Sequence, residues 1–164
     1  MYWDIPQEQS GFDFSNYKRN LKLEKSGQKD LQLKYKKTGT TIVGCIYKDG
    51  VMLGADTRAT AGPIIADPDC VKIHYLAPNM YCCGAGTAAD NEFVTQMMAS
   101  ELEMHRSYTG RESRIAHAEA RLCNYLFRYQ GYIGAHLIIG GVDVNGPQLI
   151  TISNYGNSMR TPYT

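Results

Sequence analysis

The sequence lacks the features that mark several large classes of protein. Its 164 residues contain no apolar run near the roughly 18 residues that a membrane-spanning helix requires, so a membrane protein is not expected. The first residues lack a positively charged start followed by an apolar block, which argues against a secretory signal. The formal net charge is only +1, and no basic helix or aromatic-interleaved patch indicates nucleic-acid binding. The length suits one domain with a sizeable core.

The number and spacing of the cysteines favour neither disulfide bonds nor a zinc site. There are five, an odd number in a chain without a secretory signal, which predicts reduced thiols and an intracellular location. No Cys-x-x-Cys pair is present, so a zinc site made from Cys70, His74 and Cys82 or Cys83 is not favoured. We therefore expect neither a metal nor another cofactor.

The chain changes character at position 40. Residues 1–39 carry eight Lys or Arg and five Asp or Glu, whereas the remainder carries nine basic and eleven acidic residues. Little in the first segment can be buried, although a weak alternation at 31–37 could add a strand to another sheet. These features indicate a leader or extension, and a disordered basic tail is the alternative.

Short apolar runs rich in β-branched residues predict strands on both sides of a central helical region. An Asp-Gly step at Asp49-Gly50 separates the first two runs and signals a hairpin. A second hairpin is expected around Asn145-Gly146. The predicted strands are 40–47, 51–56, 63–67, 70–76, 80–86, 135–144 and 147–153.

Two helices are predicted between these groups of strands. Val94, Met98 and Leu102 recur at four-residue steps in a helix from Thr87 to about Gly110, and a second helix begins near residue 112 and ends before residue 131. The order of strands, helices and strands predicts an α+β domain. Because the strands are apolar almost throughout, their sheet should lie between helices and a second sheet.

Three polar residues stand out against the apolar strands. Lys72 lies within a predicted buried strand and needs an anionic partner, for which Asp56 is the candidate. A purely structural ion pair that holds two strands in register is the alternative. Thr40 would become an N-terminal nucleophile, with its own α-amino group as the base, if the bond from Gly39 were cleaved. Lys72 would then stabilise the alkoxide, and the uncleaved leader would block the amine until the domain has folded.

Several motifs, in order and spacing, are similar to those of 20S proteasome β subunits. They are "TGTTIVGCIYKDGVMLGADTRAT", "CVKIHYLAPNMYCCGAGTAAD" and "RYQGYIGAHLIIGGVD", and "GFDFSNYKRN" resembles the propeptide of the same family. The chain most resembles the members with trypsin-like cleavage. The resemblance implies the N-terminal-nucleophile hydrolase fold, an αββα four-layer sandwich. Because the family's domain continues past Thr164, we expect a sandwich that is incomplete at its C-terminal end.

The resemblance also implies roles for individual residues. Thr40 would be the nucleophile released by self-cleavage after Gly39, Asp56 and Lys72 its supporting acid and lysine, and Gly86 the donor of an oxyanion N–H. Glu92 would favour Arg or Lys before the scissile bond, although a solvated acid in the first turn of a helix is the alternative. The implied substrate-binding residues are Ala59, Thr60, Gly84, Ala88 and Glu92.

These observations lead to two functional hypotheses. In the first, residues 1–39 are a propeptide and residues 40–164 a threonine endopeptidase domain, which cleaves polypeptides within a stacked ring of proteasome α and β subunits. In the second, the chain is a non-catalytic structural or interfering subunit that does not mature. The resemblance implies a location in cytoplasm and nucleus.

Overall fold

The chain divides into two units, Met1–Lys34 and Tyr35–Thr164. A computed structural model describes residues 14–25 and 39–164. In the first unit these residues form a helix, α1 (Ser15–Lys25), where the sequence predicts an irregular leader. The segment is rich in Lys, Leu, Arg and Glu, which favour helices, and its last turn carries Lys22 and Lys25. The strand considered at 31–37 and the rest of the predicted leader, apart from Gly39, lie outside the described residues.

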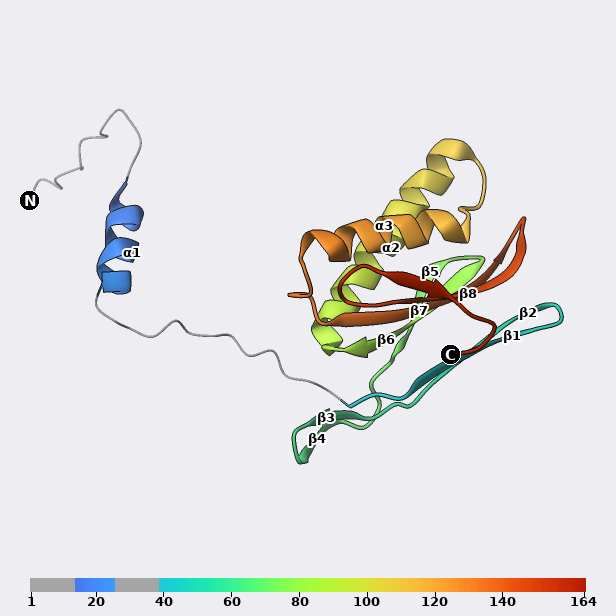
Figure 1. The fold of residues 1–164 in the computed structure, drawn as a ribbon, viewed down its shortest axis with the longest axis horizontal. Coiled ribbons are helices and arrows are strands. Elements are labelled where there is room, and N and C mark those ends of the chain that lie inside the picture. The colour runs from blue at the N-terminus through green and yellow to red at the C-terminus, as the bar shows by residue number, and fades with distance from the viewer. Residues whose placement is uncertain (1–13, 26–38) are drawn as a thin grey trace, which may run out of the picture. The chain divides into compact units, whose positions relative to one another are not determined.

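The second unit is built around a five-stranded antiparallel sheet. Its strands follow one another in chain order across the sheet, and four of them are labelled in Figure 1. The short last strand was not predicted, whereas the other four agree with the predicted runs. The strands are β5 (Ile73–Ala77), β6 (Met80–Gly86), β7 (Ala135–Asp143), β8 (Gly146–Ile152) and β9 (Ser158–Arg160).

Two helices, α2 (Ala88–Thr109) and α3 (Ile115–Arg128), cover one face of this sheet (Figure 1). The predicted stripe of α2 is buried, and Gly110 ends the helix in a left-handed conformation with a φ of 67°. From α3, Leu122 and Leu126 pack into the same core. The two predicted helices are therefore confirmed.

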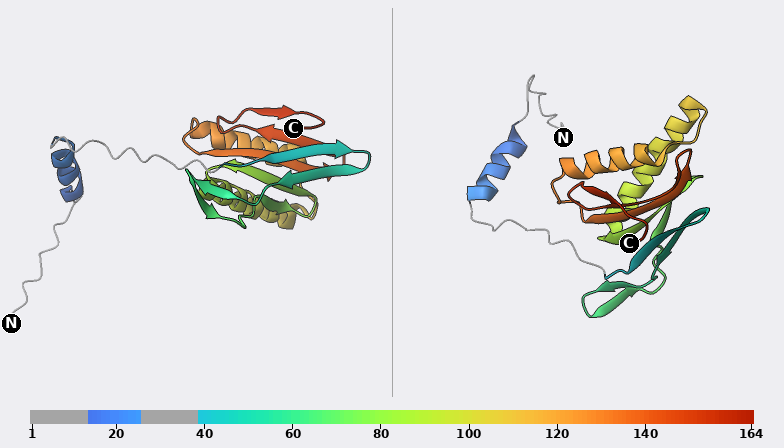
Figure 2. Two further views of the ribbon diagram at one scale, coloured as in Figure 1. Left: turned by 90° about the horizontal axis from the view of Figure 1, so that it is seen from below. Right: turned by 45° about the vertical axis from the view of Figure 1, so that its right-hand side comes forward.

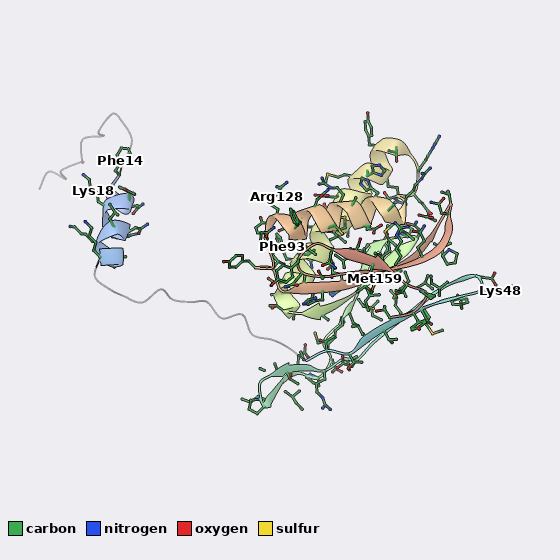
Figure 3. All side chains as sticks on the ribbon, viewed as in Figure 1. Phe14, Lys18, Lys48, Phe93, Arg128 and Met159 are labelled. Atoms are coloured by element: carbon green, nitrogen blue, oxygen red, sulfur yellow. The ribbon has the colours of Figure 1, made fainter. Side chains whose placement is uncertain are left out.

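A hairpin formed by β1 (Ile42–Tyr47) and β2 (Gly50–Ala55) lies against the opposite face (Figure 2). A Cβ atom at Gly140 of β7 would lie 2.8 Å from Val51, so the hairpin can approach the sheet only because this residue is glycine. The chain end, residues 162–164, pairs with β1 on the side away from β2. Lys48 lies at the tip of this hairpin, next to the predicted Asp49-Gly50 step (Figure 3).

A smaller hairpin, β3 (Ala59–Ala61) and β4 (Ile64–Asp67), follows. The expectation that all strands are buried on both faces is wrong here: Ile64 is 67% exposed, and Met52 on the outer side of β2 is 63% exposed. A central sheet lies between helices and a second β layer, which confirms the α+β, sandwich-like prediction. Within residues 39–164 no helix covers the outer side of that second layer. None of the helices described is long and apolar enough to span a membrane.

Candidate active site

The ends of strands from both β layers meet at one cavity. Thr40 precedes β1, Lys72 precedes β5 and Gly86 ends β6, and all three residues line a cavity of about 460 Å³. Asp56 directly follows β2 and reaches the cavity through Lys72. Residues that are far apart in the sequence are thus brought together as the resemblance implied, although their catalytic roles remain predictions.

Lys72 is the most buried charged side chain of this group, with only 5% of the side chain exposed. Its ammonium donates three hydrogen bonds, which match its three N–H groups: to Asp56 Oδ1 at 2.8 Å, to the Arg58 carbonyl at 2.6 Å and to the Gly39 carbonyl at 3.3 Å. Every N–H group of this buried ammonium therefore has a hydrogen-bond acceptor within the protein. The third acceptor is the carbonyl of the peptide bond that joins Gly39 to Thr40.

Asp56 is held from two directions and is 39% exposed, so the ion pair is less buried than the sequence predicts. Besides Lys72, the backbone N–H of Thr41 donates to Asp56 Oδ1 at 2.9 Å, and the Asp56 N–H donates to the Thr41 carbonyl at 3.0 Å. The hydrogen bond from Lys72, followed by that from Thr41, holds the pKa of the Asp56 carboxyl below its usual value. Asp56 is therefore a carboxylate at neutral pH, and it orients Lys72 beside Thr40.

Gly39, the residue before Thr40, is held through both of its backbone polar groups. The Gly39 N–H donates to Thr60 Oγ1 at 3.2 Å, while the Gly39 carbonyl accepts from Lys72. Thr60 therefore contacts the residue on the leader side of Thr40 rather than lining the main cavity. Ala59, which was grouped with it, is buried in β3 and is not part of the cavity wall.

The remaining predicted binding residues lie on the cavity wall. Gly84, Ala88 and Glu92 all line it, and Glu92 accepts a hydrogen bond from Gln96 Nε2 at 3.1 Å. Glu92 lies just after the first turn of α2 and is exposed, close to the simpler alternative of a solvated helix acid, and it also lines the cavity. These two descriptions are compatible, because the start of α2 forms part of the wall.

Sequence reasoning missed five polar residues of the same wall. Asp67 ends β4 and Asp69 follows two residues later, and both line the cavity with Glu92; the Asp69 N–H donates to Asp67 Oδ1 at 2.9 Å. His74 lies two residues after Lys72, a spacing that puts both on one side of an extended chain and could have identified it. Burial lowers the pKa of His74, opposed by the Glu92 carboxylate, so the imidazole is neutral at pH 7. Asn91 and Gln96 of α2 also line the wall, and Asn91 is buried behind Gly84.

The chemistry of the cavity uses side chains and backbone groups. Among the described residues there is no cluster of three or more His, Cys, Asp or Glu that could hold a metal ion. All five cysteines are free thiols, and Cys70 contributes to the cavity wall. A threonine hydroxyl, a buried ammonium and a carboxylate partner are the groups typical of nucleophilic acyl transfer.

Comparisons with known proteins extend over almost the whole chain. Residues 36–164 match the family described as proteasome subunit. Proteasome subunit beta type-7-B of Arabidopsis thaliana is 56% identical over 160 residues, which is 98% of this chain and 57% of that protein. The probable proteasome subunit beta type-2 of Schizosaccharomyces pombe is 55% identical over 156 residues, 95% of this chain and 58% of that protein.

A third relative carries a different type number. Proteasome subunit beta type-10 of Rattus norvegicus is 51% identical over 158 residues, which is 96% of this chain and 58% of that protein. The chain thus spans less than two thirds of the length of each of these curated relatives. The region that it shares with them includes the cavity described above.

Proposed function

The chain belongs to the proteasome subunit family, and on this premise we propose that it is a threonine-type endopeptidase subunit of the 20S core, activated by self-cleavage between Gly39 and Thr40. One observation carries the proposal: the Lys72 ammonium bridges the Asp56 carboxylate and the Gly39 carbonyl in the cavity that Thr40 lines. A purely structural ion pair could satisfy its third N–H with any acceptor, whereas here the acceptor is the carbonyl of the bond to be cleaved.

Self-cleavage begins at this contact. Thr40 Oγ attacks the Gly39 carbonyl carbon and its proton passes to the Thr40 nitrogen, so that the C–N bond breaks and an ester forms. The Lys72 ammonium, 3.3 Å from the carbonyl oxygen, favours the negative charge that develops there. Water then hydrolyses the ester, which releases the leader with a carboxyl end at Gly39 and leaves a free amine on Thr40.

The mature residue repeats the chemistry on substrates. The α-amino group of Thr40 accepts the hydroxyl proton as Thr40 Oγ attacks the scissile carbonyl, and it returns that proton to the leaving amine. Lys72, oriented by Asp56, favours the alkoxide, and the Gly86 N–H stabilises the tetrahedral oxyanion. Water completes the cycle by hydrolysing the ester. The reaction requires no metal or cofactor.

The cavity supports a preference for basic residues. Asp67, Asp69 and Glu92 supply three carboxylates to its wall, whereas Lys72 is already matched by Asp56. A substrate Arg or Lys that leaves water needs an opposite charge, which these residues provide, and the small Gly84 and Ala88 leave room for its long side chain. We expect cleavage after Arg and Lys.

We also propose the setting in which the subunit works. The subunit assembles with other proteasome α and β subunits in a stacked ring, acts on polypeptides, and works in the cytoplasm and nucleus. Five free thiols agree with a reducing compartment.

The test is to co-express the chain with the other core subunits, purify the assembled particle and determine the N-terminus by intact mass and terminal sequencing. We expect a chain that starts at Thr40, and loss of this cleavage in Thr40→Ala. The matched control is Thr109→Ala, which changes an exposed threonine at the end of α2 and should mature normally. An assembled chain that keeps Met1–Gly39 would contradict the proposal and support the non-catalytic alternative.

The same particle tests the substrate preference. Peptides that end in Arg should be hydrolysed faster than peptides that end in Leu, and Glu92→Gln should reduce this ratio by about two- to fivefold, since Glu92 is exposed and solvent weakens its ion pairs. An unchanged ratio would show that Glu92 is only a solvated acid of α2. Uncleaved Arg peptides in a mature particle would contradict the preference while leaving self-cleavage intact.

A further inference from the structure

The corner between β6 and α2 is the tightest backbone approach in the described cavity wall. Gly86 ends β6 with a φ of 110°, a conformation that other residues rarely adopt. A Cβ atom at this position would lie 2.2 Å from the Gly134 carbonyl oxygen, which is far inside van der Waals contact. The position of Gly86 therefore depends on the position of Gly134.

Gly134 is itself held by two hydrogen bonds to the start of α2. Its carbonyl accepts from the Thr87 N–H at 2.8 Å, and its own N–H donates to Asp90 Oδ2 at 2.8 Å. A Cβ atom at Gly134 would meet Thr87 Oγ1 at 2.5 Å, so the two segments are packed closely as well as bonded. Asp90, Gly134, Thr87 and Gly86 thus form one chain of contacts that ends at the cavity.

The Asp90 carboxylate is the side-chain group that makes a hydrogen bond within this chain of contacts, and it can be removed without changing the backbone. It accepts a hydrogen bond from the segment before β7, 44 residues further along the sequence. It also lies in the first turn of α2, where a negative charge is favourable. The same side chain therefore has two separable properties, a hydrogen-bond acceptor and a charge.

We infer that Asp90 is a positioning residue for the proposed reaction: through Gly134 it fixes the Gly86–Thr87 corner against which the reacting carbonyl is held. This rests on the proposed function, because it concerns the same cavity. A displacement of about 1 Å in a reacting site can lower the rate by roughly a hundredfold. Asp90 is not among the residues that line the cavity, so its loss should lower kcat far more than it raises KM.

The experiment compares Asp90→Ala with Asp90→Asn in the full chain, co-expressed with the other core subunits. Asparagine keeps an oxygen acceptor for the Gly134 N–H but removes the charge, whereas alanine removes both. We expect kcat for an Arg-ending peptide to fall at least tenfold in Asp90→Ala with KM within twofold, and Asp90→Asn to retain kcat within threefold. Glu103→Gln, which removes a charge from an exposed part of the same helix, serves as the control.

The outcomes separate positioning from other roles. A wild-type kcat in Asp90→Ala would overturn the inference, and so would an equal loss in both variants, because charge would then be the cause. Should Asp90→Ala not assemble, Asp90→Asn still decides: a loss of more than tenfold in an assembled Asp90→Asn particle contradicts the inference.

Hydrogen exchange provides a readout that needs no activity. In the particle, peptides that cover Gly86–Thr87 and Gly134 should exchange at least tenfold faster in Asp90→Ala than in wild type or Asp90→Asn. Unchanged exchange would overturn the inference even if activity fell. If wild-type particles hydrolyse no peptide, the proposed function fails, and exchange alone then decides whether Asp90 holds this corner.

Discussion

The two faces of the five-stranded sheet are packed very differently. On the helix side, sixteen described residues form one buried cluster to which the sheet and both helices contribute. On the hairpin side, only Cys83, Ile138 and Leu149 are fully buried, and the hairpin adds half-buried residues. Alternate residues of the same strands point to the two faces of the sheet, so the two faces have a similar amino-acid composition. They differ in how deeply their side chains are buried.

The difference divides the proposed active site. The helix side positions Gly86, Asp90 and the wall of α2, whereas the hairpin carries Thr40 and Asp56 on a much smaller apolar contact. Lys72 joins the two parts, because it lies at the start of β5 and bonds to Asp56 and the Gly39 carbonyl. We infer that the helix side determines stability and that the hairpin side determines how accurately the nucleophile is placed.

The largest effect on stability should come from the helix side. Leu122→Ala removes a fully buried side chain of α3 and leaves a cavity in the main cluster, which should lower the free energy of unfolding by about 3 kcal/mol. Urea denaturation of the full chain measures this value. Asn124→Ala on the exposed side of α3 should change it by less than about 0.5 kcal/mol. A loss below about 1 kcal/mol for Leu122→Ala would mean that this core is not the main source of stability.

A smaller loss of stability is expected on the hairpin side. Leu53 is only half-buried against Gly140, so Leu53→Ala should lower the free energy of unfolding by about 1 kcal/mol. It should nevertheless reduce the fraction of chains that mature to Thr40 more than Leu122→Ala does, because Leu53 lies three residues before Asp56. Met52→Ala, on the exposed side of β2, is the matched control. Equal destabilisation by the two leucine variants would remove the contrast between the faces.

The fold could be predicted from the sequence where one pattern decides it. The Asp49-Gly50 step specified the first hairpin, and the four-residue steps of Val94, Met98 and Leu102 specified α2 and its buried side. The exposure of β4 could not be predicted, since apolar runs such as Ile64-Ile65 have the same composition whether or not another layer covers them. Burial depends on tertiary packing, which local composition does not specify.

The candidate site shows the same limit. Lys72 and Asp56 stood out because charged residues are rare in apolar strands, and the structure brings them together at 2.8 Å. Asp67 and Asp69 did not stand out, because turns are ordinarily acidic and polar. They face the cavity only because the β3–β4 hairpin places their turn beside α2. Similarly, the link from Asp90 to Gly134 spans 44 residues and has no local signal.

The smallest expected effect lies on the helix side and depends on pH. His117 of α3 stacks on His105 of α2, with ring centroids 4.5 Å apart and an interplanar angle of 22°. Burial, followed by His105 and Arg121, lowers the pKa of His117, and the Glu101 carboxylate opposes this. The unfolded chain therefore takes up a proton near pH 6.5 that the folded chain does not, so stability is complete above that pH and is lost as pH falls through the lowered value.

The direction of this pH dependence of stability can be measured directly. Urea unfolding at pH 7.5 and pH 5.5 should show lower stability at the lower pH, and His117→Gln should reduce this difference by about half a kcal/mol or less, since solvent screens a partly exposed group. His136→Gln, at an exposed position of β7, is the control. An unchanged pH dependence of stability in His117→Gln would show that solvent screens the stacked pair, so that protonation of His117 does not affect the free energy of unfolding. The tighter packing of the helix side would then not extend to the end of α2, and the contrast between the two faces would be confined to the sheet itself.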